Sequence, residues 1–381
     1  MLSSRPSTAE SALVGTLHMI SPDGERQPCA PLDRWVADVT PEQLRAMHRD
    51  MVAARRIDRE GVALQRQGEL GLWAPAEGQE GVQIGTAHAL RPDDFVFPSY
   101  REHGVLVVRG AKLIDFISMW RAEELSSYNP YDLNTANPQI IIGAQTLHAV
   151  GYAMGIQRDA LTAPVGARTD QVSVAYFGDG ASSQGDVHEA MVFAASFGAP
   201  VVFVCSNNQW AISEPVTVQS HTPIADRAAG YGIPSRRVDG NDALACFGAM
   251  REALHRARAG GGPSFIEAVT YRMGPHTTSD DPTRYRAKEE VDAWRRRDPI
   301  ARLEAHLRGM GEFSDAQAAA VESFADRLGA ELRATCLAYA TKPALEIFDH
   351  VYEQPHSGIA REREEYRAYL AGFGAARGDV G

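Results

Sequence analysis

The amino-acid sequence predicts an α/β fold in which a mostly parallel sheet is flanked by helices. Between about residues 139 and 275, short apolar runs alternate with helical patterns, which is the order of a parallel βαβ arrangement. Each apolar run ends where glycine or polar residues begin, as strands do at the ligand-binding edge of such sheets. We therefore expect an α/β domain at residues 39–286, preceded by an N-terminal arm at 1–38 and followed by a helical C-terminal region at 287–381.

The first elements are predicted from composition and from capping residues. Residues 1–38 are rich in Ser, Pro and Gly and have few periodic apolar positions, so they are expected to form an arm. A long helix is predicted to begin after Thr40, because Pro41 suits the first helical position and Gln43 can complete a capping box. The apolar stripe of this helix begins with Leu44, Met47 and Met51.

The central elements are predicted as alternating strands and helices. The strands are short apolar runs bounded by turn residues, and the helices carry apolar residues at helical spacing. Beyond residue 287 the sequence is charged, Ala-rich and helical in period, so we expect helices that pack on the sheet or on another subunit. Strands are expected at Val172–Phe177, Pro200–Cys205 and Ser264–Tyr271, and helices at Asp186–Ala195 and Ala243–Ala259.

The composition excludes several classes of protein. Of the 381 residues 44% are apolar and 23% are charged, which is typical of a soluble globular protein. The net charge of −11 disfavours nucleic-acid binding, and the basic run at Arg295–Arg297 is surrounded by acids. Four scattered cysteines without a CxxC pair favour a reduced, cytoplasmic chain. Without an export signal or a long apolar run, the chain is expected neither to be secreted nor to enter a membrane.

Two polar motifs follow neighbouring predicted strands. Gly178-Asp179-Gly180 ends one strand and Asn207-Asn208 ends the next, with residues 181–206 between them. The carboxylate of Asp179 and the amide oxygen of Asn208 are hard donors of the kind that Mg²⁺ prefers. The glycine turn allows the backbone, with its N–H groups, to approach an anionic ligand closely. The sequence therefore predicts a magnesium site that also holds a diphosphate.

This segment, GDGASSQGDVHEAMVFAASFGAPVVFVCSNNQWAIS, contains the thiamine-diphosphate motif and resembles the α subunits of pyruvate and branched-chain 2-oxo acid dehydrogenases, the E1 component. The resemblance covers most of the chain, because similar blocks occur in the same order. It implies a thiamine-diphosphate-binding fold, oxidative decarboxylation of a 2-oxo acid, and acyl transfer to the lipoyl group of an E2 acyltransferase. The blocks are LQRQGEL, FPSYREHG, PQIIIGAQTLHAVG, YGIPSRRVDGND and YRMGPHTTSDDPTRYR.

The resemblance also assigns roles around the metal and the diphosphate. It implies that Asp179, Asn208 and the main-chain oxygen of Trp210 ligate Mg²⁺. A forked guanidinium such as that of Arg101 suits a diphosphate. The residues implied to line or contact the diphosphate are Tyr100, Arg101, Gly180 and Ala181.

Further roles concern the organic part of the cofactor and the chemistry. Ile140 and Ile142 are implied to contact the aminopyrimidine through backbone groups, and the side chain of Ile142 to support the cofactor in its bent form. His276 is implied to be the catalytic histidine beside the thiazolium ring. We expect its pKa to be near neutral, because that suits proton transfer.

The resemblance implies partners as well. Thiamine enzymes of this type pair a diphosphate domain with a pyrimidine domain, and this chain has the pattern of the first only. A β subunit is expected to supply the second, so that the cofactor lies at the α/β interface of an α₂β₂ heterotetramer. The lipoyl domain of E2 is the expected acyl acceptor, and a small 2-oxo acid is the expected substrate.

The chain departs from its relatives at several positions. Ser206 stands where some branched-chain relatives have an arginine, and this difference is expected to weaken one diphosphate contact. The segment Ser126–Asn137 lacks the usual Gly- and His-bearing sequence, so its order without cofactor is open. Thr277 stands where mammalian relatives carry a phosphorylated serine, and phosphorylation is not expected here.

Residues around these motifs have alternative interpretations. His103 is a candidate to reach the site, whereas His188 is expected on the helix after the cofactor loop. Asp280 and Asp281 are expected in a loop that orders when a ligand binds. Arg272 is expected to pair with those acids or to face water.

Other functions fit the sequence less well. A nicotinamide-dependent dehydrogenase needs GxGxxG after a strand, but Ser183 occupies the third glycine position. A non-catalytic binding subunit is disfavoured, because Asp179, Asn208 and His276 occur together. An acetoin dehydrogenase α subunit stays an alternative. Branched-chain 2-oxo acids are favoured over pyruvate, with the choice resting on pocket residues such as Ser99 and Ile140 and on the β subunit.

Overall fold

The computed structural model describes residues 9–123, 128–164, 166 and 169–373. The chain divides into two compact units, Met1–Leu337 and Ala338–Gly381. The first unit contains the sheet and every predicted site residue. The second contains a 3₁₀ turn, Ala344–Phe348, and helix α15, Ser357–Ala371, in which no residue is buried.

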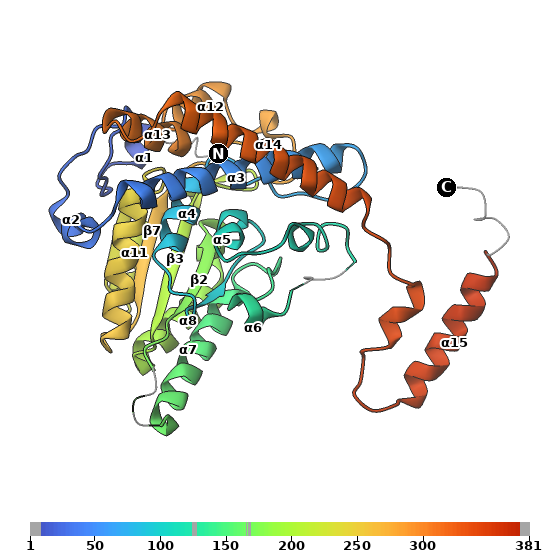
Figure 1. Ribbon diagram of the computed structural model, residues 1–381. Coiled ribbons are helices and arrows are strands. Elements are labelled where there is room, and N and C mark those ends of the chain that lie inside the picture. Colours follow the sequence, from blue (N-terminus) through green and yellow to red (C-terminus); the bar gives the residue numbers. More distant parts are fainter. Residues whose placement is uncertain (1–8, 124–127, 165, 167–168, 374–381) are drawn as a thin grey trace. The chain divides into compact units, whose positions relative to one another are not determined.

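The first unit is built on a five-stranded sheet in which all strands are parallel (Figure 1). This confirms the predicted fold class. A short antiparallel pair, β4 (Trp210–Ala211) and β5 (Glu214–Pro215), follows the third strand. The order across the main sheet is β1 (Phe95–Phe97), β2 (Ser173–Gly178), β3 (Val201–Asn207), β7 (Ser264–Val269) and β6 (Ser235–Asp239).

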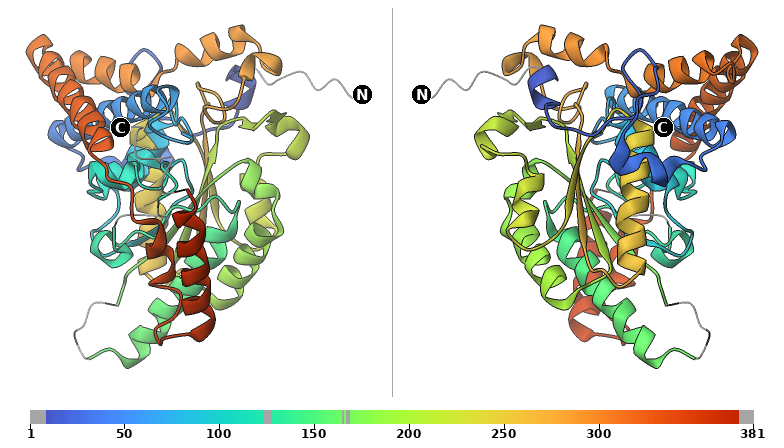
Figure 2. Two further views of the ribbon diagram at one scale, coloured as in Figure 1. Left: turned by 90° about the vertical axis from the view of Figure 1, so that its right-hand side faces the viewer. Right: turned by 90° about the vertical axis from the view of Figure 1, so that its left-hand side faces the viewer.

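Both faces of the sheet are covered by helices, so its central strands are buried and mostly apolar (Figure 2). Side chains of β2 alternate between two cores: Val174 and Tyr176 belong to one, Ala175 and Phe177 to the other. The second core is closed by α7 (Ala144–Thr162), α8 (Gly185–Phe197) and α10 (Ala225–Ala229). The first core is closed by α2 (Ala30–Val36), α3 (Pro41–Arg66), α4 (Glu80–His88), α11 (Ala243–Arg258) and α13 (Pro299–Gly309).

The remaining helices of this unit are short or lie after the sheet. The predicted absence of strands beyond residue 287 is confirmed for the part of the chain that is described. None of the described helices is both long and apolar enough to cross a bilayer. The elements are α1 (Ala9–Ala12), α5 (His103–Val108), α6 (Pro130–Leu133), α9 (Val216–Gln219), α12 (Lys288–Arg295) and α14 (Asp315–Leu337), with 3₁₀ turns at Leu113–Phe116, Gly180–Ser183 and Pro282–Arg284.

Local signals located the elements to within two or three residues at either end. The predicted helix after Thr40 is α3, and its capping box is formed on both sides: Thr40 accepts from the backbone N–H of Gln43, and Gln43 accepts from that of Thr40. The strand predicted at Ser264–Tyr271 ends at Val269. The other predicted strands and helices match β2, β3, α8 and α11.

Two strands were not predicted. β1 has only three residues, too few to show a period. β6 carries Arg236 and Arg237 within the sequence SRRVD and lies at the edge of the sheet, where side chains reach water. The apolar-run criterion therefore missed it.

The segment predicted as an arm contributes to the core. Leu17 bridges to Val238 of the edge strand β6, and the backbone N–H groups of Met19 and Ile20 both donate to the carboxylate of Asp242, at 2.6 and 2.7 Å. The side chains of Met19 and Ile20 are buried. Residues 9–38 thus pack on the sheet of their own chain.

Candidate active site

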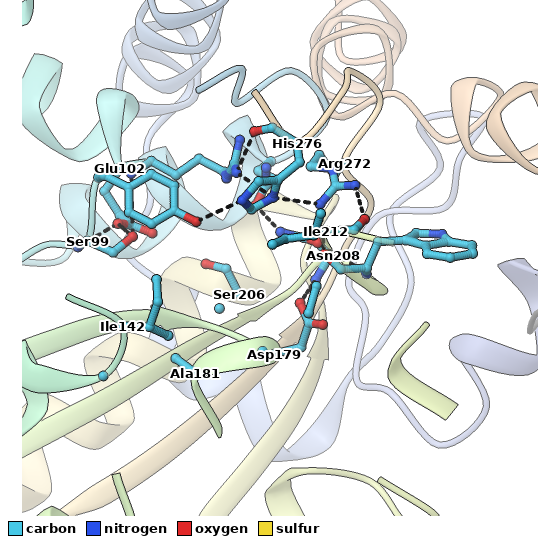
Figure 3. Close-up of a pocket in the computed structure, with 18 of the residues that line it drawn as sticks. Ser99, Glu102, Ile142, Asp179, Ala181, Ser206, Asn208, Ile212, Arg272 and His276 are labelled. Carbon is cyan, nitrogen blue, oxygen red and sulfur yellow. Dashed lines mark hydrogen bonds between the residues drawn. The ribbon is translucent and has the colours of Figure 1, made fainter. Parts of the chain in front are cut away.

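The polar residues that follow the strands converge on one cavity of about 220 Å³ (Figure 3). Its lining comes from the loops after β1, β2, β3 and β7, which all end at the same edge of the parallel sheet. Ligands bind at this edge in open α/β folds. Of the predicted site residues, Tyr100, Arg101, Ile142, Asp179, Gly180, Ala181, Asn208, Trp210 and His276 line the cavity.

The two predicted metal-binding loops are neighbours, as expected from the adjacency of β2 and β3. The backbone N–H of Asn208 donates to Oδ1 of Asp179 at 3.3 Å. Asp179 is 1% exposed, and burial raises the pKa of its carboxyl group to about 6, with Arg272 as the largest opposing influence. A buried carboxylate whose charged form is disfavoured gains most from a bound cation.

The donors around Asp179 fit Mg²⁺ held together with a diphosphate. Oδ2 of Asp179 accepts one long bond from Gln219, at 3.5 Å, which leaves acceptor capacity. No cluster of three or more His, Cys, Asp or Glu side chains suited to a metal occurs among the described residues. Mg²⁺ commonly takes one or two carboxylates and completes its octahedron with phosphate oxygens and water. The set is therefore too small for a metal held by protein alone.

The two other predicted oxygen ligands already accept hydrogen bonds. Oδ1 of Asn208 accepts from the N–H of Trp210 at 3.3 Å, and the carbonyl of Trp210 accepts from Arg272 at 2.8 Å. Each such oxygen has two lone pairs, so each keeps one for a metal. Gln79 fixes the amide of Asn208, because its Oε1 accepts from Nδ2 at 3.2 Å. The oxygen and nitrogen of Asn208 are thereby distinguished.

The space beside these donors suits an anion. A Cβ added to Gly180 would lie 2.7 Å from the Cβ of Ala211, so only glycine keeps the backbone this close. The buried donors that line the cavity without a hydrogen-bond partner in the described chain include Nε2 of Gln79 and Oγ of Ser206. Buried donors without partners indicate a missing acceptor. Phosphate oxygens would supply it.

Tyr100 and Arg101 line the cavity, but the guanidinium group of Arg101 already makes hydrogen bonds within the chain. The buried guanidinium of Arg101 donates to the carbonyl of Pro75 at 2.5 Å and to that of His276 at 2.8 Å. The guanidinium carbon of Arg101 lies 5.3 Å from the ring centre of Tyr100. Arg101 therefore holds the His276 loop and contributes positive charge to the cavity.

His276 does not have the near-neutral pKa that was expected. Its pKa is lowered to about 3, first by burial and then by the positive charges of Arg101 and Arg272. Nδ1 faces N–H groups of Arg272 at 3.1 Å and of Arg101 at 3.3 Å, so it must accept. The proton of the neutral ring is thus assigned to Nε2, which faces the hydroxyl of Tyr100 at 3.5 Å. The sequence shows the histidine but not the two guanidinium groups around it.

Arg272 neither faces water nor pairs directly with the acids of the loop, contrary to both expectations. It is fully buried and donates to the carbonyls of Trp210 and Ile212, both at 2.8 Å, and to the hydroxyl of Tyr285 at 3.0 Å. Tyr285 in turn donates to Asp280 at 2.5 Å. The arginine joins the loop after β3 to the loop that carries His276.

Asp280 and Asp281 stabilise the loop they occupy. Oδ2 of Asp280 accepts from the backbone N–H of His276 at 2.7 Å. Oδ1 of Asp281 accepts from the N–H of Thr283 at 3.1 Å and caps a 3₁₀ turn. Thr277, the candidate phosphorylation position, directly follows the histidine, and its hydroxyl accepts a bond from Ser279.

The segment predicted to contact the aminopyrimidine is divided. Ile142 lines the cavity, together with Ile141. Ile140 is 58% exposed and is not among the described residues that line it. The order of the segment Ser126–Asn137 was left open by the sequence. Residues 126 and 127 lie outside the described residues, and Pro130–Leu133 forms α6.

Several lining residues carried no signal in the sequence. Gln79, Glu102 and Gln219 reach the cavity from segments that are far apart in sequence, and no local period marks them. Two other histidines lie elsewhere: His103 stacks on Trp73 at 4.7 Å, and His188 bonds to Tyr231 at 2.7 Å. Burial lowers the pKa of His103 to about 4.

Comparisons with known proteins find a matching family and several similar proteins. Residues 48–331 match the model of the family described as "Dehydrogenase E1 component". The chain is 47% identical to the 3-methyl-2-oxobutanoate dehydrogenase subunit alpha of Mycobacterium tuberculosis. This alignment spans 356 residues, which is 93% of this chain and 94% of the relative. The chain is 40% identical to the pyruvate dehydrogenase E1 component subunit alpha of Acholeplasma laidlawii, over 87% of this chain and 94% of that one. It is 42% identical to the pyruvate dehydrogenase E1 component subunit alpha of Bacillus subtilis, over 74% of this chain and 75% of that one.

Proposed function

The chain belongs to the dehydrogenase E1 component family, and on this premise we propose that it is the α subunit of a thiamine-diphosphate-dependent 2-oxo acid dehydrogenase. It is an oxidoreductase that decarboxylates a 2-oxo acid oxidatively and passes the acyl group to a lipoyl group. The observation that supports this most is the meeting of Asp179 and Asn208 at the carboxyl edge of the sheet, beside two buried donors without partners in the described chain. A diphosphate and its metal would satisfy all four groups.

The residues of this chain hold the cofactor at its charged end. Asp179, Asn208 and the carbonyl of Trp210 would ligate Mg²⁺, while Ser206 and Gln79 would donate to the diphosphate. Gly180 and Ala181 leave room for it, and Ile142 supports the organic part. When bound, thiamine diphosphate supplies the electron sink that decarboxylation needs.

His276 holds a proton at Nε2. Because Arg101 and Arg272 donate towards Nδ1, the ring is held as the tautomer that presents Nε2–H. The Nε2–H group can donate a hydrogen bond to an oxygen of the substrate and stabilise the negative charge that develops there. The proton stays on the ring, because its loss from the neutral imidazole would leave an imidazolate. Tyr100 and Asp280 orient the histidine from either side.

We propose a branched-chain 2-oxo acid as the substrate. The support is the 47% identity over nearly the whole chain to a protein named for 3-methyl-2-oxobutanoate, and the apolar residues Ile141, Ile142 and Ile212 that line the cavity. Pyruvate is the next candidate, since the relatives from Acholeplasma laidlawii and Bacillus subtilis are named for it. Acetoin is the third.

The proposed partners complete the enzyme. A β subunit would supply the pyrimidine domain in an α₂β₂ heterotetramer, and the lipoyl domain of E2 would accept the acyl group. We propose that this assembly works in the cytoplasm. No nucleic acid or membrane partner is proposed.

Co-expression with a β-type E1 subunit tests the function. The purified complex is assayed with an artificial electron acceptor on 3-methyl-2-oxobutanoate, pyruvate and acetoin, with and without thiamine diphosphate and Mg²⁺. We expect turnover only with both cofactors and the highest kcat/KM on the branched-chain acid. Turnover that persists after both cofactors are removed would overturn the proposal, and a preference for pyruvate or acetoin would overturn the assigned substrate.

A further inference from the structure

A second cavity, of about 250 Å³, opens at the opposite end of the sheet from the candidate active site. It lies where β6 and β7 begin, between α2 and α11, which pack beside each other (Figure 1). Ser235 and Ser264, the first residues of the two strands, both line it. The candidate active site lies where the parallel strands end. A ligand in the second cavity would therefore not compete with the cofactor.

Most of this cavity is apolar. Trp35 of α2 forms one wall, and its ring lies 5.1 Å from that of His255, tilted by 51°. An aromatic wall of this kind can pack against a flat apolar or aromatic group. The apolar floor comes from Pro234, Ala249, Ala253, Phe265 and Ile266.

The charged groups around the cavity leave an excess of positive charge. Arg34 and Arg256 both line it, and the side chain of neither makes a hydrogen bond or ion pair with any residue that is described. The guanidinium carbon of Arg34 lies 4.6 Å from the ring centre of Trp35. The one acid in its described lining, Glu252, is neutralised by Arg236 through two bonds of 2.7 and 2.9 Å. The indole N–H of Trp35 is also buried without an acceptor among the described residues. Neither guanidinium has a carboxylate partner among the described residues, although the net charge of the chain is −11.

The end of α11 does not explain the position of Arg256. Basic residues often stabilise the last carbonyls of a helix, and Arg256 lies in the last turn of α11. Here the carbonyls of His255, Arg256 and Ala257 already accept from the backbone N–H groups that follow the helix. Arg258, in the same turn, pairs with the buried carboxylate of Asp94. Arg256 has no acceptor in the described part of the chain, although it lines the cavity.

The walls are fixed by contacts that do not involve a ligand. Arg251 donates to the carbonyl of Trp35 at 2.9 Å and pairs with Asp38, which ties α2 to α11. A Cβ on Gly248 of α11 would lie 3.1 Å from Val36, so the two helices pack closely. The cavity is preformed, as small-molecule sites commonly are.

We propose that this cavity is a second binding site, which takes an organic anion: a carboxylate or phosphate ester with an apolar or aromatic body. The anionic head binds Arg34 and Arg256, and the body packs between Trp35 and the floor. Arginine suits either head group, because its fork matches both. The proposal does not depend on the reaction at the other end of the sheet.

The test uses the fluorescent probe 8-anilino-1-naphthalenesulfonate, which has an aromatic body and one anionic group. The full chain is titrated in complex with its β subunit, and energy transfer from tryptophan to the probe is recorded. We expect saturable binding that Arg34→Gln/Arg256→Gln weakens at least about tenfold, since the double variant loses both charged hydrogen bonds to the anionic head. Trp35→Phe should remove most of the energy transfer.

Matched controls separate this site from general attraction of the probe. Arg49→Gln/Arg327→Gln removes the same charge from exposed positions on α3 and α14 and should leave binding unchanged. Phenyl phosphate or phenylacetate should displace the probe, and saturating thiamine diphosphate with Mg²⁺ should not. The proposal fails if the cavity double variant binds as tightly as wild type, if Trp35→Phe transfers energy normally, or if inorganic phosphate displaces the probe as well as phenyl phosphate does.

Discussion

At the scale of single residues, the burial of Asp179 opposes the charge that its carboxylate needs in order to bind a metal. Burial raises the pKa of this carboxyl group to about 6. The chain without ligand therefore holds a buried charge at neutral pH. In the proposed function, Mg²⁺ balances this charge.

Asp179→Asn should abolish Mg²⁺-dependent binding of thiamine diphosphate and stabilise the ligand-free chain. A folded-state pKa above the unfolded value means that the wild-type carboxylate destabilises the fold above about pH 6, and that this penalty disappears as the pH falls towards about 4. At pH 8 the gain in free energy of unfolding should be on the order of 2 to 3 kcal/mol. Calorimetry of cofactor binding and urea unfolding at pH 5 and pH 8 measure both effects. A variant that is destabilised at pH 8 would contradict the assignment.

His276→Asn should keep cofactor binding and lower kcat by about 10²–10³-fold, the usual cost of losing one hydrogen-bond donor to a developing negative charge. Because Arg101 and Arg272 donate towards Nδ1, the neutral ring presents Nε2–H as that donor. Cofactor titration and steady-state kinetics of the α/β complex separate binding from turnover. His188→Asn is the matched control, since that histidine bonds to Tyr231 away from the cavity. Normal turnover in His276→Asn would remove its role.

The ligand-free chain should show the lowered pKa of His276 in its stability. An unfolded histidine gains a proton near pH 6.5, whereas the folded ring resists protonation until about pH 3. Stability due to this residue is thus present above about pH 6.5 and is lost as the pH falls towards about 3. Thermal unfolding of wild type and His276→Asn between pH 7 and 4 should show a smaller acid-side loss in the variant. Parallel curves would refute the lowered pKa.

At the scale of elements, the turn after β2 has no room for a side chain at Gly180. Gly180→Ala brings a Cβ to 2.7 Å from Ala211, and such overpacking costs about 1–3 kcal/mol. We expect a lower unfolding midpoint in urea and weaker cofactor binding. Gly185→Ala, at the first position of α8, meets no atom within 4 Å and should lower neither. Equal behaviour of the two variants would show that the turn adapts.

At the scale of the whole molecule, the site lies within one unit. Every residue that lines the candidate active site belongs to Met1–Leu337. A chain ended after Leu337 should therefore unfold in one transition with an unchanged urea midpoint. Loss of that cooperative transition, measured by circular dichroism, would mean that Ala338–Gly381 is part of the same folding unit.

The sequence by itself determined the α/β class, the central strands and helices, and the pairing of Asp179 with Asn208. Strand periodicity and the rule that parallel strands end at one edge are local and topological, so they can be inferred from residue order. The sequence did not determine the lowered pKa of His276, the burial of Arg272, the positions of Gln79 and Gln219, or the cavity between α2 and α11. These depend on which distant segments become neighbours, and on how much water their packing removes. Only the tertiary structure decides that.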